Sequence, residues 1–409
     1  MIKDEEKRIT EAPARKPRRD SMADFLSPVA RSIAPSGIRR FFDLASGRKD
    51  IITLGVGEPD FVTPWHVREA CVYSLETGKT QYTSNAGVPE LREEIAHYLD
   101  TQFEVSYDPA KEVIVTVGGS EAIDLALRAL ISPGDEILVP EPCYITYSPI
   151  TQLSGGVPVG VETFAKDEFK LQADSLKAAL TPRSKVLVLC YPSNPTGGIM
   201  TYEDWLPIAK VVEENDLIVI SDEIYAELTY GSRHVSFASM PGMKDRTILV
   251  SGFSKAFAMT GWRMGYACGH PDIISAMLKI HQYTVLCAPI MGQVAALEAL
   301  RNGLEEKDRM IESYNQRRRL VVRGFRDIGL ECHEPRGAFY AFPSIKSTGL
   351  SSEQFATRLL QEHSVAAVPG DVFGLGGEGH LRCSYATSVS QLNEAIERIG
   401  QFVRKLKGD

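Results

Sequence analysis

Between residues 112 and 250 the sequence alternates short apolar runs with longer stretches of helical character. Short strands with few polar residues, separated by helices, are typical of a mostly parallel sheet covered on both faces. The pattern therefore predicts an α/β fold whose ligand lies beyond the carboxyl ends of the strands. The expected strands are residues 113–117, 136–139, 157–161, 185–190, 217–221 and 247–250, and the expected helices include 121–130 and 203–214.

The C-terminal part of the chain has a different pattern. From about residue 298 it is highly charged and helical, and the arginine run 317–319 is interpreted as a solvated helix face. Short strands follow, and a chain of 409 residues is long for one domain. We therefore expect a second, α+β domain. Its elements are the expected strands 338–342, 366–368 and 381–384 and an amphipathic helix at 390–405.

Composition argues against several classes of function. The net charge of -8 disfavours a nucleic-acid surface, and no apolar run reaches the roughly 18 residues of a membrane helix. Residues 1–24 are charged and contain two prolines, so we expect a disordered tail rather than a secretory signal. The seven cysteines form no CxxC pair and the histidines form no HxxxH pattern, so reduced thiols in the cytoplasm and no metal site are expected.

One loop places a lysine among small and apolar residues. Residues 251–265 follow an apolar strand and consist mainly of small and apolar residues around Lys255, with Arg263 close downstream. A desolvated lysine loses its proton more readily and becomes a nucleophile toward a carbonyl, whereas an arginine fork can hold a phosphate. A carbonyl and a phosphate on one ligand indicate pyridoxal phosphate. A buried structural lysine with an unrelated arginine is the alternative.

Other polar residues follow the expected strands. Gly119 and Ser120 open a helix, where amide groups attract a phosphate, although Ser120 is also an ordinary N-cap residue. Asp222 directly follows an apolar strand, and a pyridinium nitrogen would pair with a carboxylate there, unless it caps the next helix. Tyr225 lies one helical turn further on. Asn194 could donate to a ring oxygen or serve only as a turn residue.

Two further residues have both a functional and a structural interpretation. The ring of Tyr144, in a loop after a strand, could stack on a flat cofactor or pack in the core. Arg382 lies in an otherwise apolar strand. A buried guanidinium is stabilised by a carboxylate partner, most strongly in bidentate geometry. That carboxylate would belong either to a substrate or to an internal salt bridge.

Taken together, these residues resemble the class I/II aminotransferases of fold type I, in particular the aspartate and aromatic amino-acid subgroup. The resemblance covers nearly all of the chain after the tail. It implies a mostly parallel seven-stranded sheet between helices in a large domain, residues 47–300, and a smaller α+β domain formed by residues 25–46 and 301–409. The matching stretches are Gly57–Phe61, Tyr82 with Gly87–Arg92, Tyr191–Gly197, Ser221–Tyr225, Gly252–Lys255 with Arg263–Gly265, and Arg382–Thr387.

The same resemblance implies roles around the cofactor ring. Lys255 would form the Schiff base with pyridoxal 5'-phosphate and carry protons, and Asp222 would bind the pyridine nitrogen. Tyr225 and Asn194 would hold the ring hydroxyl oxygen. Tyr144 would stack on the ring.

The phosphate end is implied in the same way. Gly119, Ser120 and Arg263 would bind the phosphate, and Tyr82 would reach the phosphate of the neighbouring subunit, which requires a homodimer. The family often has a hydroxyl residue at the position of Gly252, so Ser254 is assigned to the phosphate, with Ser251 as the alternative.

The substrate end is implied less fully. Arg382 would bind the substrate α-carboxylate beside Asn194 and the backbone of Gly57. Arg39 or Arg40 could pair with a side-chain carboxylate, or either could be a surface charge. Aromatic substrates could be favoured by Phe339, Tyr340 and Trp65, or these residues could belong to the core.

The expected reaction is transamination between an L-amino acid (aspartate, aromatic, alanine or methionine) and a 2-oxo acid such as 2-oxoglutarate. A carbon–sulfur β-lyase on the same fold would share every cofactor residue. A non-catalytic regulator would need a DNA-binding segment that the N-terminal tail is too short to supply. A nicotinamide enzyme is disfavoured because no GxGxxG follows a first strand.

Overall fold

The structure is a computed structural model that describes residues 21–35, 37–38 and 50–408. It divides between Ala34 and Pro35 into two compact units. In the first unit, η1 (Met22–Phe25) is followed by α1 (Pro28–Ser32). The Ser27 hydroxyl caps α1 by accepting a hydrogen bond of 3.1 Å from the Ala30 amide. Residues 1–20 of the expected tail lie outside the described residues.

The second unit is built around a seven-stranded sheet with the order β2-β8-β7-β6-β5-β3-β4. Strand β8 runs antiparallel to both of its neighbours and the other pairs are parallel, so the predicted mostly parallel sheet is confirmed. Strand β8 is not among the strands expected from the sequence. The strands are β2 (Val113–Thr116), β3 (Glu136–Glu141), β4 (Val157–Glu162), β5 (Ser184–Cys190), β6 (Ile218–Asp222), β7 (Thr247–Gly252) and β8 (Gly265–Cys268).

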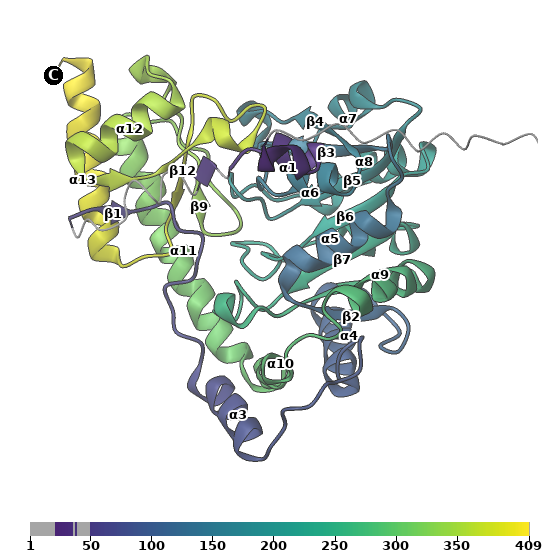
Figure 1. Cartoon of the computed structure of the whole chain (residues 1–409). Helices are drawn as coiled ribbons and strands as arrows, with labels where there is room; N and C mark the ends of the chain where they lie inside the picture. Colours follow the sequence, from purple (N-terminus) through teal and green to yellow (C-terminus); the bar gives the residue numbers. More distant parts are fainter. Residues whose placement is uncertain (1–20, 36, 39–49, 409) are drawn as a thin grey trace, which may run out of the picture. The chain divides into compact units, whose positions relative to one another are not determined.

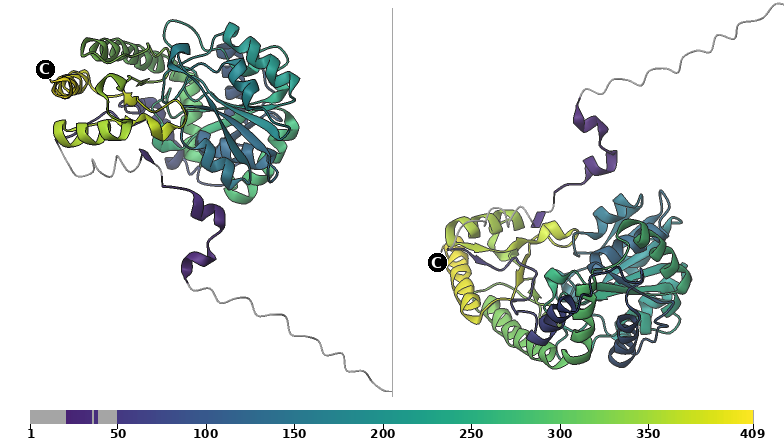
Figure 2. Two further views of the ribbon diagram at one scale, coloured as in Figure 1. Left: turned by 90° about the horizontal axis from the view of Figure 1, so that it is seen from above. Right: turned by 60° about the horizontal axis from the view of Figure 1, so that its bottom comes forward.

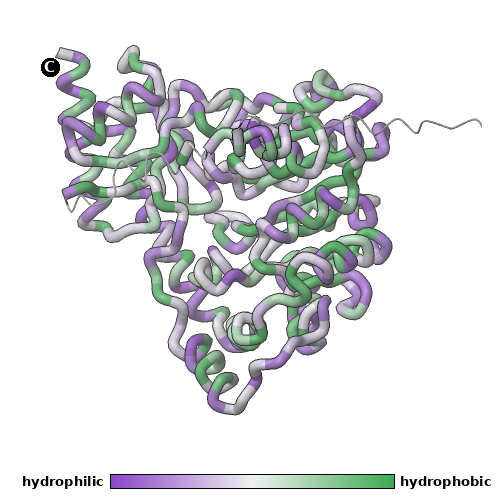
Figure 3. The backbone as a smooth tube through the Cα atoms, viewed as in Figure 1, coloured by the Kyte–Doolittle hydropathy of each residue, from purple (hydrophilic) through white to green (hydrophobic). Residues whose placement is uncertain are grey.

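Helices cover both faces of this sheet (Figures 1 and 2). On one face α5 (Gly118–Leu130) and α9 (Pro271–Thr284) share an apolar cluster with the strands. On the other face α7 (Ala173–Ala179) and α8 (Tyr202–Glu214) contribute Leu176 and Trp205 to a second cluster. Hydrophobic residues recur along these helices with hydrophilic residues between them, as amphipathic covering helices require (Figure 3).

The remaining helices precede or follow the sheet. The charged, helical stretch expected from about residue 298 lies in two helices, α10 and α11, which meet at Gly303. The helices are α3 (Trp65–Glu76), α4 (Pro89–Phe103), α6 (Tyr147–Leu153), α10 (Ile290–Asn302) and α11 (Leu304–Asp327). Short 3-10 helices are η2 (Ala165–Asp167), η3 (Phe237–Ser239), η4 (Lys244–Arg246), η5 (Thr260–Trp262), η6 (Lys346–Thr348) and η7 (Gly370–Phe373).

The C-terminal part has two small sheets. Strand β12 (Leu381–Ser384) lies between β11 (Val368–Pro369) and β9 (Tyr340–Ala341), and both pairs are antiparallel. Strand β1 (Ile52–Thr53) pairs in parallel with β10 (Val365–Ala366). Helices α12 (Ser352–His363) and α13 (Val389–Lys407) complete this part. The domain boundaries stay a prediction.

The interpretation of the arginine run as a solvated face is wrong for two of its three members. Arg317 and Arg318 are 9% and 7% exposed. Arg317 donates a hydrogen bond of 2.7 Å to Asp60, and Arg318 pairs with Glu334. Their charge therefore ties α11 to neighbouring loops, because a buried guanidinium needs a carboxylate partner. No described helix is both long and apolar enough to span a membrane.

Candidate active site

The polar residues singled out in the sequence follow neighbouring strands at one edge of the sheet. Cys190, Asp222 and Val250 lie level in the adjacent strands β5, β6 and β7. Asn194 and Lys255 come a few residues after β5 and β7. The parallel order of these strands thus brings their carboxyl ends, and the side chains that follow, to one place.

Lys255 combines burial with a defined hydrogen bond. Its Nζ donates a hydrogen bond of 2.6 Å to the Gly57 carbonyl. Burial lowers the pKa of Lys255 to about 8; the Glu58 carboxylate opposes this shift, while the Arg382 and Arg263 cations add to it. A much larger fraction of this amine is neutral near pH 7 than of an exposed lysine, so it can act as a nucleophile or a base.

Asp222 is a buried carboxylate with partners on both oxygens. It is 6% exposed, the Tyr147 hydroxyl donates a hydrogen bond of 2.7 Å to Oδ2, and the Ile224 amide donates one of 3.2 Å to Oδ1. Burial raises the pKa of Asp222 to about 6, and the bond from Tyr147 opposes that rise. Asp222 is therefore mainly ionised at neutral pH and favours a cationic partner.

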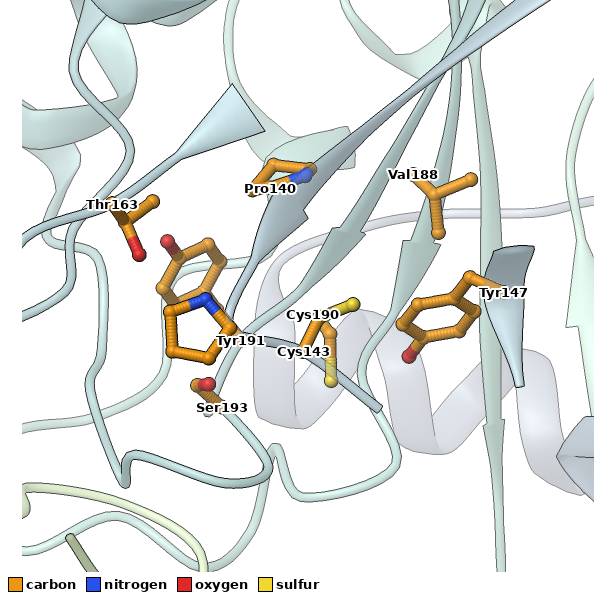
Figure 4. A pocket seen from close by; sticks show the side chains of 9 residues that line it. Pro140, Cys143, Tyr147, Thr163, Val188, Cys190, Tyr191 and Ser193 are labelled. Atoms are coloured by element: carbon orange, nitrogen blue, oxygen red, sulfur yellow. The ribbon is translucent and has the colours of Figure 1, made fainter. Parts of the chain in front are cut away.

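A small pocket is lined by Tyr147, the residue whose hydroxyl donates to Asp222 (Figure 4). Tyr147 lines it together with Cys143 and Cys190. Burial raises the pKa of the Cys190 thiol to about 12, and it raises that of Cys143 strongly as well. Both thiols are therefore neutral at physiological pH and add no charge beside Asp222.

Tyr225 is held by a second tyrosine. Its hydroxyl oxygen lies 2.8 Å from that of Tyr340, and the two residues are 3% and 1% exposed. Phe339 packs edge-on against the Tyr225 ring, with ring centroids 5.5 Å apart. This packing leaves the Tyr225 side chain little freedom to change its orientation.

Arg382 is 3% exposed and only partly paired. Its Nη1 donates a hydrogen bond of 2.9 Å to Asn194 Oδ1, and its Nη2 donates one of 2.6 Å to the Gly55 carbonyl. Its guanidinium lies 4.6 Å from the ring centroid of Tyr340, and its Nε has no hydrogen-bond partner among the described residues. No carboxylate neutralises it in these contacts, so the internal salt bridge considered above is not formed by them. The guanidinium is suited to an external anion.

The start of α5 forms a cradle for an anion. Gly118 has φ +77°, and a Cβ there would lie 2.5 Å from Arg263 Nη2, so the guanidinium lies directly against this turn. Gly265 in β8 also lies against it, since a Cβ on Gly265 would come within 2.5 Å of the Gly118 carbonyl carbon. The first amides of a helix attract anions, and an arginine beside them adds charge. Gly119 is partly exposed and Ser120 is exposed at this end.

The two candidate serines differ in their surroundings. Ser251 belongs to β7, and its hydroxyl donates a hydrogen bond of 3.2 Å to the Glu223 carbonyl. Ser254 lies after the strand and is 7% exposed. The bond to Glu223 occupies the Ser251 proton, which favours Ser254 as the hydroxyl available to a phosphate.

Tyr144 and Tyr82 occupy different environments. Tyr144 is partly buried, and its ring meets the edge of Tyr147 at a centroid distance of 5.7 Å. Tyr82 is 83% exposed. The Tyr82 side chain is thus accessible from solution, whereas Tyr144 packs against Tyr147.

The sequence does not single out Tyr147, and it indicates Tyr340 only as a residue that could favour aromatic substrates or belong to the core. Tyr147 is 75 residues from Asp222 in the sequence, and Tyr340 is 115 residues from Tyr225. No local pattern marks either contact. Among the other substrate candidates, Phe339 is buried and Trp65 is 62% exposed, while Arg39 and Arg40 lie outside the described residues.

The side chains present fit pyridoxal 5'-phosphate. Lys255 supplies an amine for its aldehyde, the buried carboxylate of Asp222 a partner for its ring nitrogen, and Arg263 with the start of α5 a place for its phosphate. Within the described chain, no group of three or more histidine, cysteine or acidic side chains could hold a metal ion.

Comparison with known proteins places this geometry in a family. The family model described as aminotransferase class I and II matches residues 49–399. The candidate aminotransferase YugH of Bacillus subtilis (strain 168) is 55% identical over 94% of this chain and 100% of its own length. An aspartate aminotransferase of Pyrococcus abyssi is 45% identical over 92% of this chain and 97% of its own length.

A solved structure agrees with these relatives. The aspartate aminotransferase of Thermus thermophilus with maleate has a TM-score of 0.88 and 38% sequence identity. The match covers 92% of this chain and 99% of that one. Fold and sequence comparison therefore point to the same family.

Proposed function

This chain belongs to the class I and II aminotransferases, which use pyridoxal 5'-phosphate, and from that premise we propose the reaction partners and the role of each side chain. The proposed reaction moves an amino group from an L-amino acid to a 2-oxo acid, with 2-oxoglutarate as acceptor. Two observations together carry this proposal. The pKa of Lys255 is lowered, and the Nε of the buried Arg382 has no hydrogen-bond partner among the described residues. Lys255 can handle protons where Arg382 holds a carboxylate.

Four side chains would hold the cofactor ring. Asp222 pairs with the ring nitrogen, because its ionised and buried carboxylate gains most from a cationic partner. Tyr225 and Asn194 donate to the ring hydroxyl oxygen, and Tyr144 stacks on the ring. When bound, the cofactor supplies an electron sink, which keeps its efficiency only while the ring nitrogen remains protonated beside Asp222.

The phosphate would lie at the start of α5. Gly119, Ser120 and Arg263 bind it, Ser254 contributes a hydroxyl, and Tyr82 of a second copy completes the group. The exposure of Tyr82 supports this homodimer, and the free cysteines support a reducing cytoplasm.

Substrate binding would use Arg382. Its guanidinium takes the α-carboxylate while Asn194 and the backbone of Gly57 lie beside it. This places the Cα–H bond near Lys255, whose neutral amine accepts the α-proton and later returns it to a neighbouring carbon. Arg382 would hold the carboxylate in one orientation. The α-proton and the Lys255 amine would then react within one complex and would not need a further encounter.

The substitution Lys255→Ala tests this assignment. We expect steady-state transamination to be abolished, because one amine performs both proton transfers. Lys279→Ala, a change of an exposed lysine, is the control and should retain normal turnover. Appreciable steady-state transamination by the Lys255 variant would contradict the proposal.

The donor amino acid is tested separately. Rates with aspartate, aromatic amino acids, alanine and methionine are compared at fixed 2-oxoglutarate. Activity that requires the oxo acid supports transamination. Steady release of pyruvate and ammonia without any acceptor would instead identify the carbon–sulfur β-lyase.

A further inference from the structure

Tyr340 lies between the two ends of the proposed site. Its hydroxyl is 2.8 Å from that of Tyr225, and the face of its ring is 4.6 Å from the guanidinium carbon of Arg382. The first contact reaches the group proposed to hold the cofactor ring oxygen. The second reaches the group proposed to hold the substrate carboxylate.

The surroundings of Tyr340 fix its position. Ser384 in β12 is its partner in the sheet register, and the Phe339 ring centroid lies 4.9 Å from its own. A Cβ on Gly57 would come within 2.5 Å of the Tyr340 hydroxyl oxygen, so that hydroxyl lies tightly against the Gly57 backbone. With 1% of its surface exposed, the side chain is enclosed by its neighbours, and close packing of this kind restricts its movement.

The direction of the hydrogen bond between the tyrosines follows from their donors. Each hydroxyl has one proton, and Tyr225 needs its own proton for the cofactor ring oxygen. Tyr340 must then donate to Tyr225, which satisfies both hydroxyls. In a chain of this kind each bond polarises the next, so the first donor strengthens the second.

The Arg382 cation acts on both tyrosines. Burial raises the pKa of Tyr340 and of Tyr225, and Arg382 opposes the rise in each. The direction of the hydrogen bond therefore follows from the proton that Tyr225 needs for the cofactor and not from this charge.

We propose that Tyr340 is a positioning residue: its hydroxyl orients and polarises Tyr225 toward the cofactor, and its ring supports Arg382 for the substrate carboxylate. This inference rests on the function proposed above. It predicts that the two contributions can be separated by substitution, because one depends on the hydroxyl and the other on the ring.

The hydroxyl is tested with Tyr340→Phe in the cofactor-loaded protein. The measured quantity is the pH midpoint of the visible absorbance band, which reports the proton on the nitrogen joining Lys255 to the cofactor. When the hydrogen bond from Tyr225 to the ring oxygen weakens, the nitrogen joined to Lys255 binds its proton more tightly. We expect the midpoint to rise by about 0.5 to 1 pH unit, the size that one hydrogen bond of ordinary net strength supports.

A double-substitution cycle shows whether Tyr340 acts through Tyr225. Tyr225→Phe should raise the midpoint further than Tyr340→Phe does, and the double variant should match Tyr225→Phe alone. Gly57→Ala should shift the midpoint in the same direction, since its methyl group displaces the Tyr340 hydroxyl. Tyr230→Phe removes another buried hydroxyl, which donates to the Ala338 carbonyl, and should leave the midpoint unchanged.

The ring is tested by binding of unreactive carboxylates, maleate and hydrocinnamate. Tyr340→Phe keeps the ring and should bind them as the unchanged protein does. Tyr340→Leu removes it and should weaken binding about five- to tenfold, the range of a cation–π contact.

Three outcomes would count against the inference in different ways. A shift with Tyr225→Phe but none with Tyr340→Phe would refute the inference and leave the proposed function intact. If Tyr225→Phe itself causes no shift, the role proposed for Tyr225 fails as well. Equal carboxylate affinity in the Phe and Leu variants would refute the part assigned to the ring.

Discussion

Two ionisable side chains of the site have pKa values displaced in opposite directions. Burial lowers the pKa of Lys255 to about 8 and raises that of Asp222 to about 6. Burial disfavours the charged form of each group, so one cause explains both shifts. Between these values the carboxylate is mainly charged while a useful fraction of the amine is neutral, which suits a cofactor that needs an anion at one end and a nucleophile at the other.

The lowered pKa of Lys255 predicts a pH profile for the cofactor-free protein. The rate at which pyridoxal 5'-phosphate joins Lys255 should rise about tenfold per pH unit at acidic pH and level off above pH 8, because only the neutral amine attacks. Stopped-flow absorbance measures this rate. Lys255→Ala supplies the background from other lysines.

A free lysine derivative should instead keep gaining rate toward its ordinary pKa of 10.5. A protein profile that follows the free amine throughout would contradict the shift. The same shift affects stability: the unfolded chain holds the proton more tightly, so this group's contribution to the free energy of unfolding rises with pH between about 8 and 10.5.

At the scale of elements, the contact between β8 and the start of α5 decides where the phosphate site lies. Gly265 allows the strand to touch the Gly118 backbone, and Arg263 reaches the same turn from the preceding residues. The sequence indicates Arg263 as a phosphate ligand, but it does not predict β8. Its four residues, Gly265–Cys268, directly follow a loop and run antiparallel to the neighbouring strands, so the α/β alternation does not mark them.

Gly265→Ala tests this contact. A methyl group there would meet backbone atoms at 2.5 Å, so the strand or the helix start must move. We expect a loss of about 1 to 3 kcal/mol in unfolding free energy and weaker binding of pyridoxal 5'-phosphate. Gly261→Ala, with no atom within 4 Å of the added carbon, is the matched control.

Denaturant unfolding and cofactor titration measure the two effects for both variants. Equal behaviour of the Gly265 and Gly261 variants would show that this contact has no part in forming the phosphate site. A stability loss without weaker cofactor binding would limit it to a structural role.

At the scale of the whole molecule, the proposed shared site makes activity a property of two copies. Lys255 and Tyr82 would serve one cofactor from different chains. Dimers of the Lys255→Ala chain have no catalytic amine, and dimers of the Tyr82→Ala chain lack the phosphate contact in both sites. A mixed dimer would contain one complete site.

Mixing the two variants tests this arrangement. After dissociation and reassociation, random pairing should restore about one quarter of the unchanged protein's activity at limiting cofactor. Each variant alone is the control. Activity no greater than the average of the two separate variants would contradict a shared site.

The sequence by itself determined the class of reaction and much of the fold. The apolar alternation predicted the mostly parallel sheet, and the residues at its strand ends, Asn194, Asp222 and Lys255, are brought to one edge. These inferences succeed because strand alternation and parallel topology are local and geometric. The small and apolar residues around Lys255 in the sequence also predict that its side chain is desolvated.

Only the tertiary structure decided which partners those residues have. Tyr147 on Asp222 and Tyr340 on Tyr225 join residues far apart in the chain, and burial of Arg317 beside Asp60 reversed the expectation for a charged helix face. A sequence pattern indicates the average environment of one face of a helix or strand. A hydrogen bond depends instead on how several elements pack, because a displacement of a fraction of an ångström changes its geometry. For this protein, residue types therefore indicate the reaction, and packing sets the pKa values and hydrogen bonds on which the proposed mechanism depends.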